Sequence, residues 1–135
     1  MVAILTARDI FSPHALGLVD RLTHGLRDVA GVKRVTSLTN LTEFQGEGDL
    51  LKSGPLVSEI PRTKGESAAL RGKIMSDPWY AGRLVSRDGR STIVSVTLAN
   101  SDTLEEALAA LDRIRNYVDR IKGDLEVNYA GSLVM

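Results

Sequence analysis

One amphipathic segment near the carboxyl end constrains the fold more than any other part of the chain. Between Leu104 and Ile121 apolar side chains recur at steps of three and four, with Arg and Asp on the other faces. The stripe comprises Leu104, Ala107, Leu111, Ile114, Val118 and Ile121. We predict a helix that begins at a capping box of Asp102 and Glu105 and ends at Gly123. Its single apolar stripe must pack against another element.

The next residues indicate what that element is. Leu125, Val127 and Tyr129 alternate with Glu126 and Asn128, a pattern typical of a half-buried strand. We therefore interpret the stripe as a helix packed on a sheet. A coiled-coil seam is the alternative, but a helix that already covers a sheet has no free apolar face for a second chain.

The first forty residues repeat this alternation. Val2 to Thr6 is a β-prone run, and Ser12-Pro13 then predicts a helix start that continues to about Ala30. Gly31 suits the end of that helix, and Val32 to Leu38 is the next predicted strand.

The middle of the chain, residues 39–90, breaks the pattern with frequent Gly and Pro. We expect an extended excursion with one short strand around Leu56 to Ile60. A capping box of Thr63 and Glu66 predicts a short helix that ends at Asp77-Pro78. Residues 84–87 and 92–98, joined by Asp88-Gly89, predict a β-hairpin.

Without this excursion the order of elements is β-α-β-β-α-β. We predict an α+β fold of the ferredoxin-like split βαβ type, formed by residues 1–135 as one domain with the 39–90 excursion inside it. Val2 to Thr6 and Ile93 to Leu98 are the most apolar strands, which predicts central positions and burial on both faces. Two helices should cover one face, and the excursion or a neighbouring domain should cover part of the other.

Composition and motifs argue against several function classes. Seventeen basic and seventeen acidic residues cancel, which gives no support to nucleic-acid binding, and the absence of Cys excludes thiolate chemistry and disulfides. No segment approaches the roughly 20 apolar residues of a membrane span. His14 and His24 would lie about 15 Å apart on one helix, too far to share a metal. Neither a catalytic triad nor a phosphate-binding glycine motif is present. We predict no catalytic, cofactor-binding or metal site, and no enzyme activity.

Aromatic residues are the remaining candidates for a functional surface. Trp79 and Tyr80, with Met75 one turn before them, form the one aromatic cluster, and Phe44 is a weaker candidate. The cluster either anchors the excursion to the sheet or faces a substrate path or a partner domain, because large amphipathic rings suit both roles.

An ordered set of motifs resembles the first extracytoplasmic loop of exporters of the RND (resistance–nodulation–division) superfamily. The similarity lies in residues 11–16 (FSPHAL), 29–32 (VAGV), 35–40 (VTSLTN), 76–92 (SDPWYAGRLVSRDGRST) and 127–131 (VNYAG). It covers nearly the whole chain in order and spacing. The most similar branches are the hydrophobe/amphiphile efflux type and the related mycobacterial large membrane proteins. The porter subdomains of this family have a split βαβ fold.

The resemblance implies a periplasmic or outer-face domain of a proton-driven integral membrane exporter. Its partners would be the second extracytoplasmic domain and the membrane helices of the same transporter, and its cargo hydrophobic or amphiphilic compounds such as lipids or drugs. The family's proton-relay residues lie in membrane helices, so this chain would not transport by itself. The alternative is a stand-alone ferredoxin-like module that binds a small molecule or dimerises, although such modules rarely carry so long an excursion.

Overall fold

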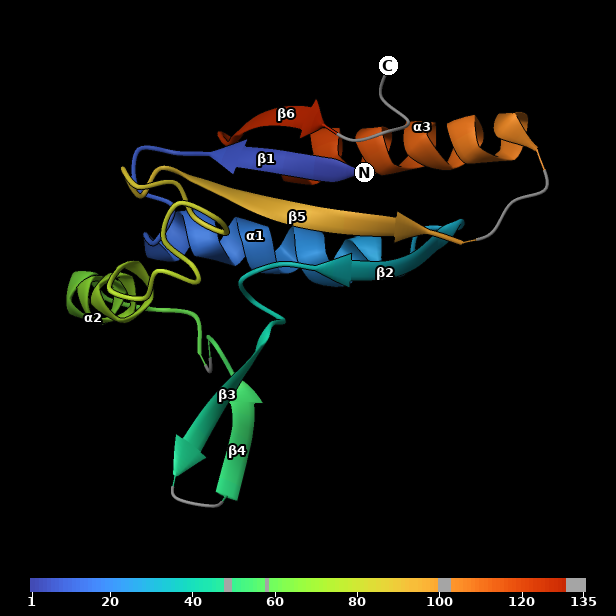
Figure 1. Ribbon diagram of the computed structural model, residues 1–135. Helices are drawn as coiled ribbons and strands as arrows, with labels where there is room; N and C mark the ends of the chain where they lie inside the picture. Colours follow the sequence, from blue (N-terminus) through green and yellow to red (C-terminus); the bar gives the residue numbers. More distant parts are fainter. Residues whose placement is uncertain (48–49, 58, 100–102, 131–135) are drawn as a thin grey trace.

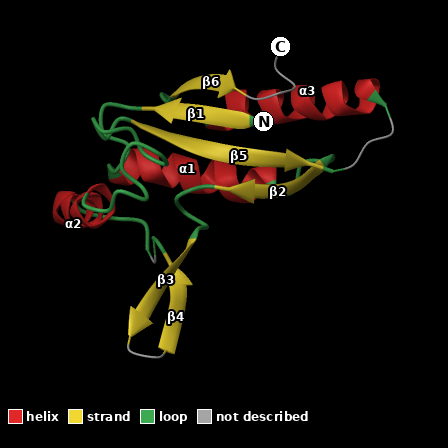
Figure 2. Cartoon of the chain, viewed as in Figure 1, coloured by secondary structure: helices red, strands yellow, loops and turns green. Residues whose placement is uncertain are grey.

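The computed structural model describes residues 1–47, 50–57, 59–99 and 103–130, and for 42–47 and 50–55 the backbone alone. Within these residues the chain is α+β, with a four-stranded antiparallel sheet, a separate two-stranded hairpin and three helices (Figures 1 and 2). The strands are β1 (Val2–Thr6), β2 (Val32–Thr36), β3 (Thr42–Glu47), β4 (Leu50–Pro55), β5 (Ser91–Leu98) and β6 (Glu126–Ala130). The helices are α1 (Pro13–Leu26), α2 (Lys64–Met75) and α3 (Leu104–Ile121).

The large sheet has the strand order β2-β5-β1-β6, with all neighbours antiparallel. The prediction that the first strand and the strand before the last helix are central is therefore confirmed. Figure 1 shows α1 and α3 lying side by side behind the sheet, while α2 lies beyond the end at which β5 begins.

The core lies between the sheet and the pair of helices α1 and α3. Ala3 and Leu5 of β1, and Val94 and Val96 of β5, point to this side and are buried with the apolar stripes of both helices. The prediction that the central strands are buried on both faces is wrong. Burial alternates along β1 and β5, because no helix of the described residues lies over the other face.

The helix caps explain where α1 and α3 begin. In α1 the Ser12 hydroxyl accepts a hydrogen bond from the backbone N–H of Ala15 at 3.2 Å. In α3 the cap is Thr103, whose hydroxyl accepts from the N–H of Glu106 at 3.2 Å. The cap therefore lies one residue after the predicted one, Asp102, which is outside the described residues. A capping box has the same spacing from 102 to 105 as from 103 to 106, so spacing alone does not distinguish the two.

The predicted end is correct for α3 and wrong for α1. α3 ends as expected, with Gly123 at φ +57° directly after its last residues. α1 stops at Leu26, a turn before the predicted end at Ala30, because residues 27–32 form tight turns closed by bonds such as Val29 N–H to Leu26 O at 3.1 Å. Gly31, at φ +94°, belongs to those turns and leads into β2.

The segment after β2 is a capped turn rather than more strand. The Asn40 side chain closes this turn through two hydrogen bonds to the backbone. Its Oδ1 accepts from the N–H of Ser37 at 2.7 Å, and its Nδ2 donates to the Val35 carbonyl at 2.6 Å. The buried Ser37 hydroxyl also hydrogen-bonds that of Thr23 on α1 at 2.6 Å. The Ser-Leu-Thr-Asn sequence thus ties the end of β2 to α1.

The excursion contributes to the core instead of lying loosely over it. The predicted strand around Leu56 to Ile60 is wrong. The strands are β3 and β4, a hairpin that projects from the body of the molecule (Figure 1) and is closed at its base by the Leu56 N–H and the Leu41 carbonyl at 2.8 Å. Leu56, Val57 and Ile74 of α2 are buried in the main core.

The Asp88-Gly89 hairpin is also smaller than predicted. Residues 84–87 form no strand, and one antiparallel bridge joins Val85 to Thr92. Gly89 has φ +71°, but no described residue other than glycine has a positive φ, so a two-residue turn with Asp88 in that region is excluded. The turn is instead closed by the Gly89 N–H to the Ser86 carbonyl at 2.9 Å.

Candidate functional site

The face of the sheet opposite the helices carries a mixture of apolar and small polar side chains. Cross-strand pairing places Asn128, Ile4 and Ile93 in one row of this open face. A second row contains Ala130, Val2, Ser95 and Thr36. The β1 and β5 residues of these rows are partly exposed. The face therefore offers an apolar centre between hydroxyl-bearing neighbours.

The structure does not bring the predicted aromatic cluster together on one surface. Trp79 is 73 % exposed, whereas Met75 and Tyr80 are half-buried against the core. The anchoring role therefore belongs to Met75 and Tyr80, and Trp79 is left as a surface group. Phe44 belongs to β3, and its side chain lies outside the described residues.

Trp79 begins a tightly turned segment that runs to Val85. Tyr80 O accepts from the N–H groups of Arg83, Leu84 and Val85, and the Gly82 N–H donates to the Val85 carbonyl at 2.7 Å. Gly82 has φ +81°, which an L side chain adopts only with strain. The backbone of this segment is thus held by its own hydrogen bonds. The side chains of Tyr80 and Val85 pack into the core, whereas those of Trp79 and Arg83 are exposed.

One guanidinium lies over the exposed indole, and a second lies close to Gly82. Arg83 lies over the Trp79 ring, with its Cζ 5.4 Å from the ring centroid. Arg87 passes close to Gly82, with its Nε 3.2 Å from the position a Cβ would occupy there. Among the described residues neither guanidinium forms an ion pair. The segment therefore presents positive charge beside an apolar ring.

This segment borders a shallow pocket on the open face. The pocket has a volume of about 210 Å³, and both the sheet and the turned segment contribute apolar and polar groups to its lining. Ile4 and Ile93 contribute from the sheet, Leu84 and Arg83 from the segment, and Ser91 from the start of β5. Apolar surface and a cation thus meet in one concave site.

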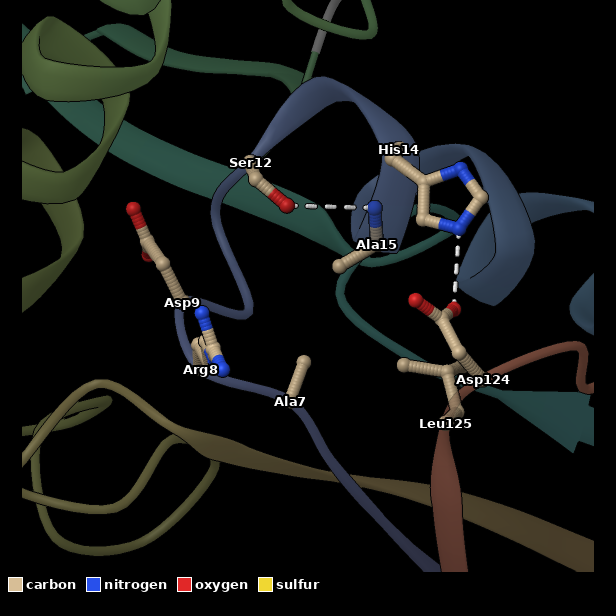
Figure 3. A pocket seen from close by; sticks show the side chains of 8 residues that line it. All are labelled: Ala7, Arg8, Asp9, Ser12, His14, Ala15, Asp124 and Leu125. Carbon is tan, nitrogen blue, oxygen red and sulfur yellow. Dashed lines mark hydrogen bonds and ion pairs between the residues drawn. The ribbon is translucent and has the colours of Figure 1, made fainter.

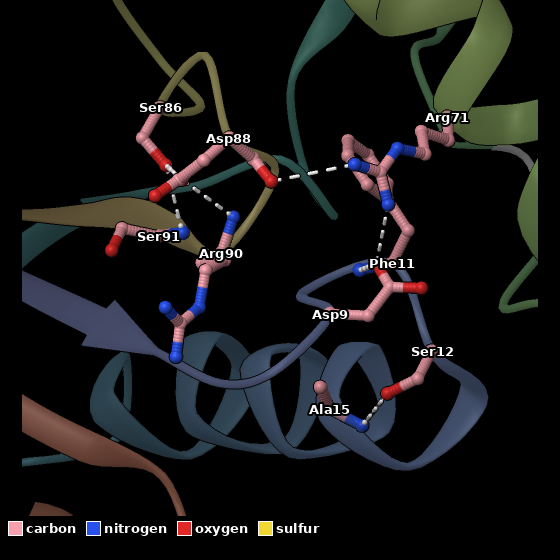
Figure 4. A network of polar contacts seen from close by, with 9 residues as sticks. All are labelled: Asp9, Phe11, Ser12, Ala15, Arg71, Ser86, Asp88, Arg90 and Ser91. Atoms are coloured by element: carbon pink, nitrogen blue, oxygen red, sulfur yellow. Dashed lines mark hydrogen bonds and ion pairs between the residues drawn. The ribbon is translucent and has the colours of Figure 1, made fainter.

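A polar clamp joins α2, the turn at residues 86–90 and the residues that follow β1 (Figure 4). Arg71 of α2 reaches the Asp9 carboxylate at 3.5 Å and the Asp88 carbonyl at 3.3 Å. The backbone of Gly89 joins the same point, because its carbonyl accepts from the N–H of Ile10 at 3.0 Å. Asp9, in turn, accepts from the Phe11 N–H at 3.0 Å.

The Asp88 carboxylate organises the turn within this clamp. It accepts hydrogen bonds from the Ser86 hydroxyl and from the Arg90 N–H. The hydrogen bond from Ser86, followed by the one from Arg90, lowers the pKa of Asp88 below its ordinary value. The carboxylate stays ionised and occupied by the turn itself.

The histidines lie where the sequence placed them, on the surface of α1. His14 Nε2 is 2.9 Å from Asp124 Oδ1, and Figure 3 shows this pair at the rim of a second pocket, of about 310 Å³. The hydrogen bond from His14 lowers the pKa of Asp124. His24 pairs with Asp20 at 3.1 Å on the same helix. In the described part of the chain no group of three His, Asp or Glu side chains could hold a metal ion.

Tyr129 of β6 packs under α3 rather than forming a site. Arg115 lies over its ring at 5.4 Å, and the buried Tyr129 hydroxyl has no hydrogen-bond partner among the described residues. Burial, and after it the nearby Asp119 carboxylate, raise the pKa of Tyr129. The group therefore stays protonated and neutral over the physiological range.

Arg83 lines the pocket, and sequence reasoning did not single it out. It is one of three arginines in the 76–92 motif, so residue type alone does not distinguish it. A usable signal was the spacing of Trp79 and Arg83 across a Gly in a turn-rich segment. The position of the pocket, however, depends on β1 and β5, which come from distant parts of the chain.

The described residues contain no helix with the length and apolarity needed to cross a membrane. No protein-family model matches the chain, and neither a curated protein nor a solved structure is significantly similar to it.

Proposed function

We propose that the chain is an extracytoplasmic substrate-path and docking domain of a proton-driven RND-type membrane exporter. The observation that carries the proposal is the open face of the sheet, with Ile4 and Ile93 at its centre and no covering helix among the described residues. A mixed apolar and hydroxyl-bearing face suits a second domain or an amphiphilic cargo, because both bring apolar surface with few charges.

The strand order supports the finer fold assignment within this proposal. The order β2-β5-β1-β6, with crossovers through α1 and α3, is what a ferredoxin-like split βαβ arrangement requires once the 39–90 excursion is set aside. The porter subdomains of the family that the motifs resemble have this arrangement. The excursion then supplies the β3–β4 hairpin, α2 and the segment that borders the pocket.

Two single cysteines test location and docking together. In the polypeptide that contains this chain, with other cysteines replaced, we would compare Ser95→Cys on the open face with Asp112→Cys on the exposed side of α3. A membrane-impermeant maleimide should label Asp112→Cys in intact cells. Ser95→Cys should be protected until the protein is denatured, because the second domain would cover the open face.

Labelling of Asp112→Cys that requires cell lysis would refute an extracytoplasmic location. Equal labelling of both cysteines would refute docking through the open face. The stand-alone module predicts a different result, namely a stable dimer of the purified chain in which Ser95→Cys is protected without any other domain. Sedimentation of the chain separates these cases.

A further inference from the structure

The pocket beside Arg83 combines a charged rim with an apolar floor. Ile4 and Ile93, paired directly across β1 and β5, form the floor, and Leu84 adds an apolar wall. Arg83, with Ser86 and Ser91, supplies the polar side. A ligand that fits both parts must be amphiphilic.

The charge at the rim selects the head group. Arg83 forms no ion pair among the described residues, and its exposed guanidinium lies against the Trp79 ring. The neighbouring acid Asp77 has its Oδ1 engaged by the Trp79 N–H at 2.9 Å. Asp88 is likewise occupied, by Ser86 and Arg90. Both carboxylates keep their charge, but residues 77–90 carry three Arg against these two Asp, which leaves a net positive charge for an anion. A planar guanidinium pairs well with a carboxylate.

The size of the pocket selects the apolar part. Its volume of about 210 Å³ lies below the range of roughly 300–1,000 Å³ that is usual for drug-sized ligands. A single narrow chain lying on Ile4 and Ile93 fits such a site better than a fused-ring compound. We propose that this pocket binds a single-chain anionic amphiphile, with the acid group on Arg83 and the chain on the two isoleucines. The inference rests on the proposed function, because it names the class of cargo.

The one tryptophan of the chain makes binding directly observable. Trp79 is the sole Trp, and an anion at Arg83 would change the surroundings of its ring. We would titrate the purified chain with decanoate below its micelle concentration, following Trp79 emission and, in parallel, the heat of binding. Decyl maltoside, which has the same chain and a neutral head, is the matched ligand. Decanoate should bind at least tenfold more tightly.

Two further comparisons test the two halves of the site. Arg83→Gln should weaken decanoate binding about tenfold or more, whereas Arg21→Gln, at an exposed position on α1, should leave it unchanged. In the series hexanoate, octanoate and decanoate, affinity should rise by about fourfold per methylene. The head-group and chain-length comparisons use the unaltered chain and so decide the matter even if a variant misfolds.

Equal affinity for decanoate and decyl maltoside, or no dependence on chain length, would overturn the proposal. A Trp79 response to phosphatidylglycerol vesicles without any response to monomeric decanoate would also overturn it, because the surface would then bind a membrane rather than one amphiphile. None of these results would affect the docking proposal, because the protection of Ser95→Cys on the open face is measured without a ligand. Conversely, loss of that protection together with tight decanoate binding would refute docking and keep the pocket.

Discussion

Helix α1 contains two glycines in opposite surroundings. Apart from its chain neighbours and the backbone of its own helix, no heavy atom of the described residues would lie within 4 Å of a Cβ built at Gly17. A Cβ at Gly25, by contrast, would lie 1.6 Å from the Tyr117 hydroxyl oxygen and 2.3 Å from its Cζ. Tyr117 belongs to α3, so Gly25 is a point at which the two helices that cover the sheet approach each other. Alanine at each position tests how much of the fold depends on that approach.

The two substitutions should change the free energy of unfolding in opposite directions. Alanine in a helix interior is favoured over glycine by about 1 kcal/mol, so Gly17→Ala should stabilise the chain by about that amount. Gly25 is next to the last helical residue, where the same gain is smaller. Accommodating its Cβ requires the half-buried Tyr117 ring to move, and overpacking of this kind costs about 1–3 kcal/mol. Gly25→Ala should therefore destabilise by about 1–2 kcal/mol.

Urea denaturation followed by far-ultraviolet circular dichroism measures both variants on the same scale. A third variant removes the Tyr117 ring that a Cβ at Gly25 would meet: in a Tyr117→Ala background, Gly25→Ala should become neutral or stabilising. If Gly25→Ala stabilises the unaltered chain as much as Gly17→Ala does, the close packing of α1 on Tyr117 is wrong. If the double variant shows no relief, the cost at Gly25 has another origin.

Three smaller predictions concern the turns and the surface pair. Gly89→Ala should destabilise by about 1–2 kcal/mol, because φ is +71° there and the new Cβ would lie 2.7 Å from an Arg71 nitrogen; urea denaturation measures this, and an unchanged midpoint would contradict it. The pKa of Asp124, measured by carbon-detected NMR, should lie below its ordinary value and return towards it in His14→Ala. The Asp124–His14 hydrogen bond therefore stabilises the fold above the ordinary pKa, and this contribution is lost as the pH falls through the lowered pKa. An unshifted titration of Asp124 would disprove the pairing. Ser86→Ala should likewise raise the pKa of Asp88, because the hydrogen bond from the Ser86 hydroxyl is the largest of the interactions that lower it.

Local signals were sufficient for elements whose ends are marked by side chains. The stripe from Leu104 to Ile121 predicted the end of α3 and its start to within one residue, because apolar periodicity and the glycine after it are both properties of neighbouring residues. Ser12-Pro13 did the same for the start of α1. The stripe did not predict how far the core extends: Leu104 is 67 % exposed and Leu108 48 %, because the first turns of α3 reach beyond the sheet.

Most of the candidate site could not be predicted from patterns of neighbouring residues. The sequence singled out Trp79 and Tyr80 together, but one is exposed and the other packs against the core. Their separation depends on the turn that the Tyr80 carbonyl closes, and on the place where the 79–85 segment meets the sheet. No periodicity encodes that meeting point.

The order of β1, α1, β2, α2, β5, α3 and β6 followed from the sequence alone, because it depends on residue identity and spacing along the chain. The lack of thiol chemistry and of a histidine pair that could share a metal followed from the same properties. The tertiary structure decided which face of the sheet stays open, that the hairpin β3–β4 projects, and that Arg83 meets Ile4 and Ile93. These features arise where residues nearly ninety positions apart pair across β1 and β5. Long-range pairing of that kind is set by the balance of packing over the whole molecule, which no short window of sequence contains.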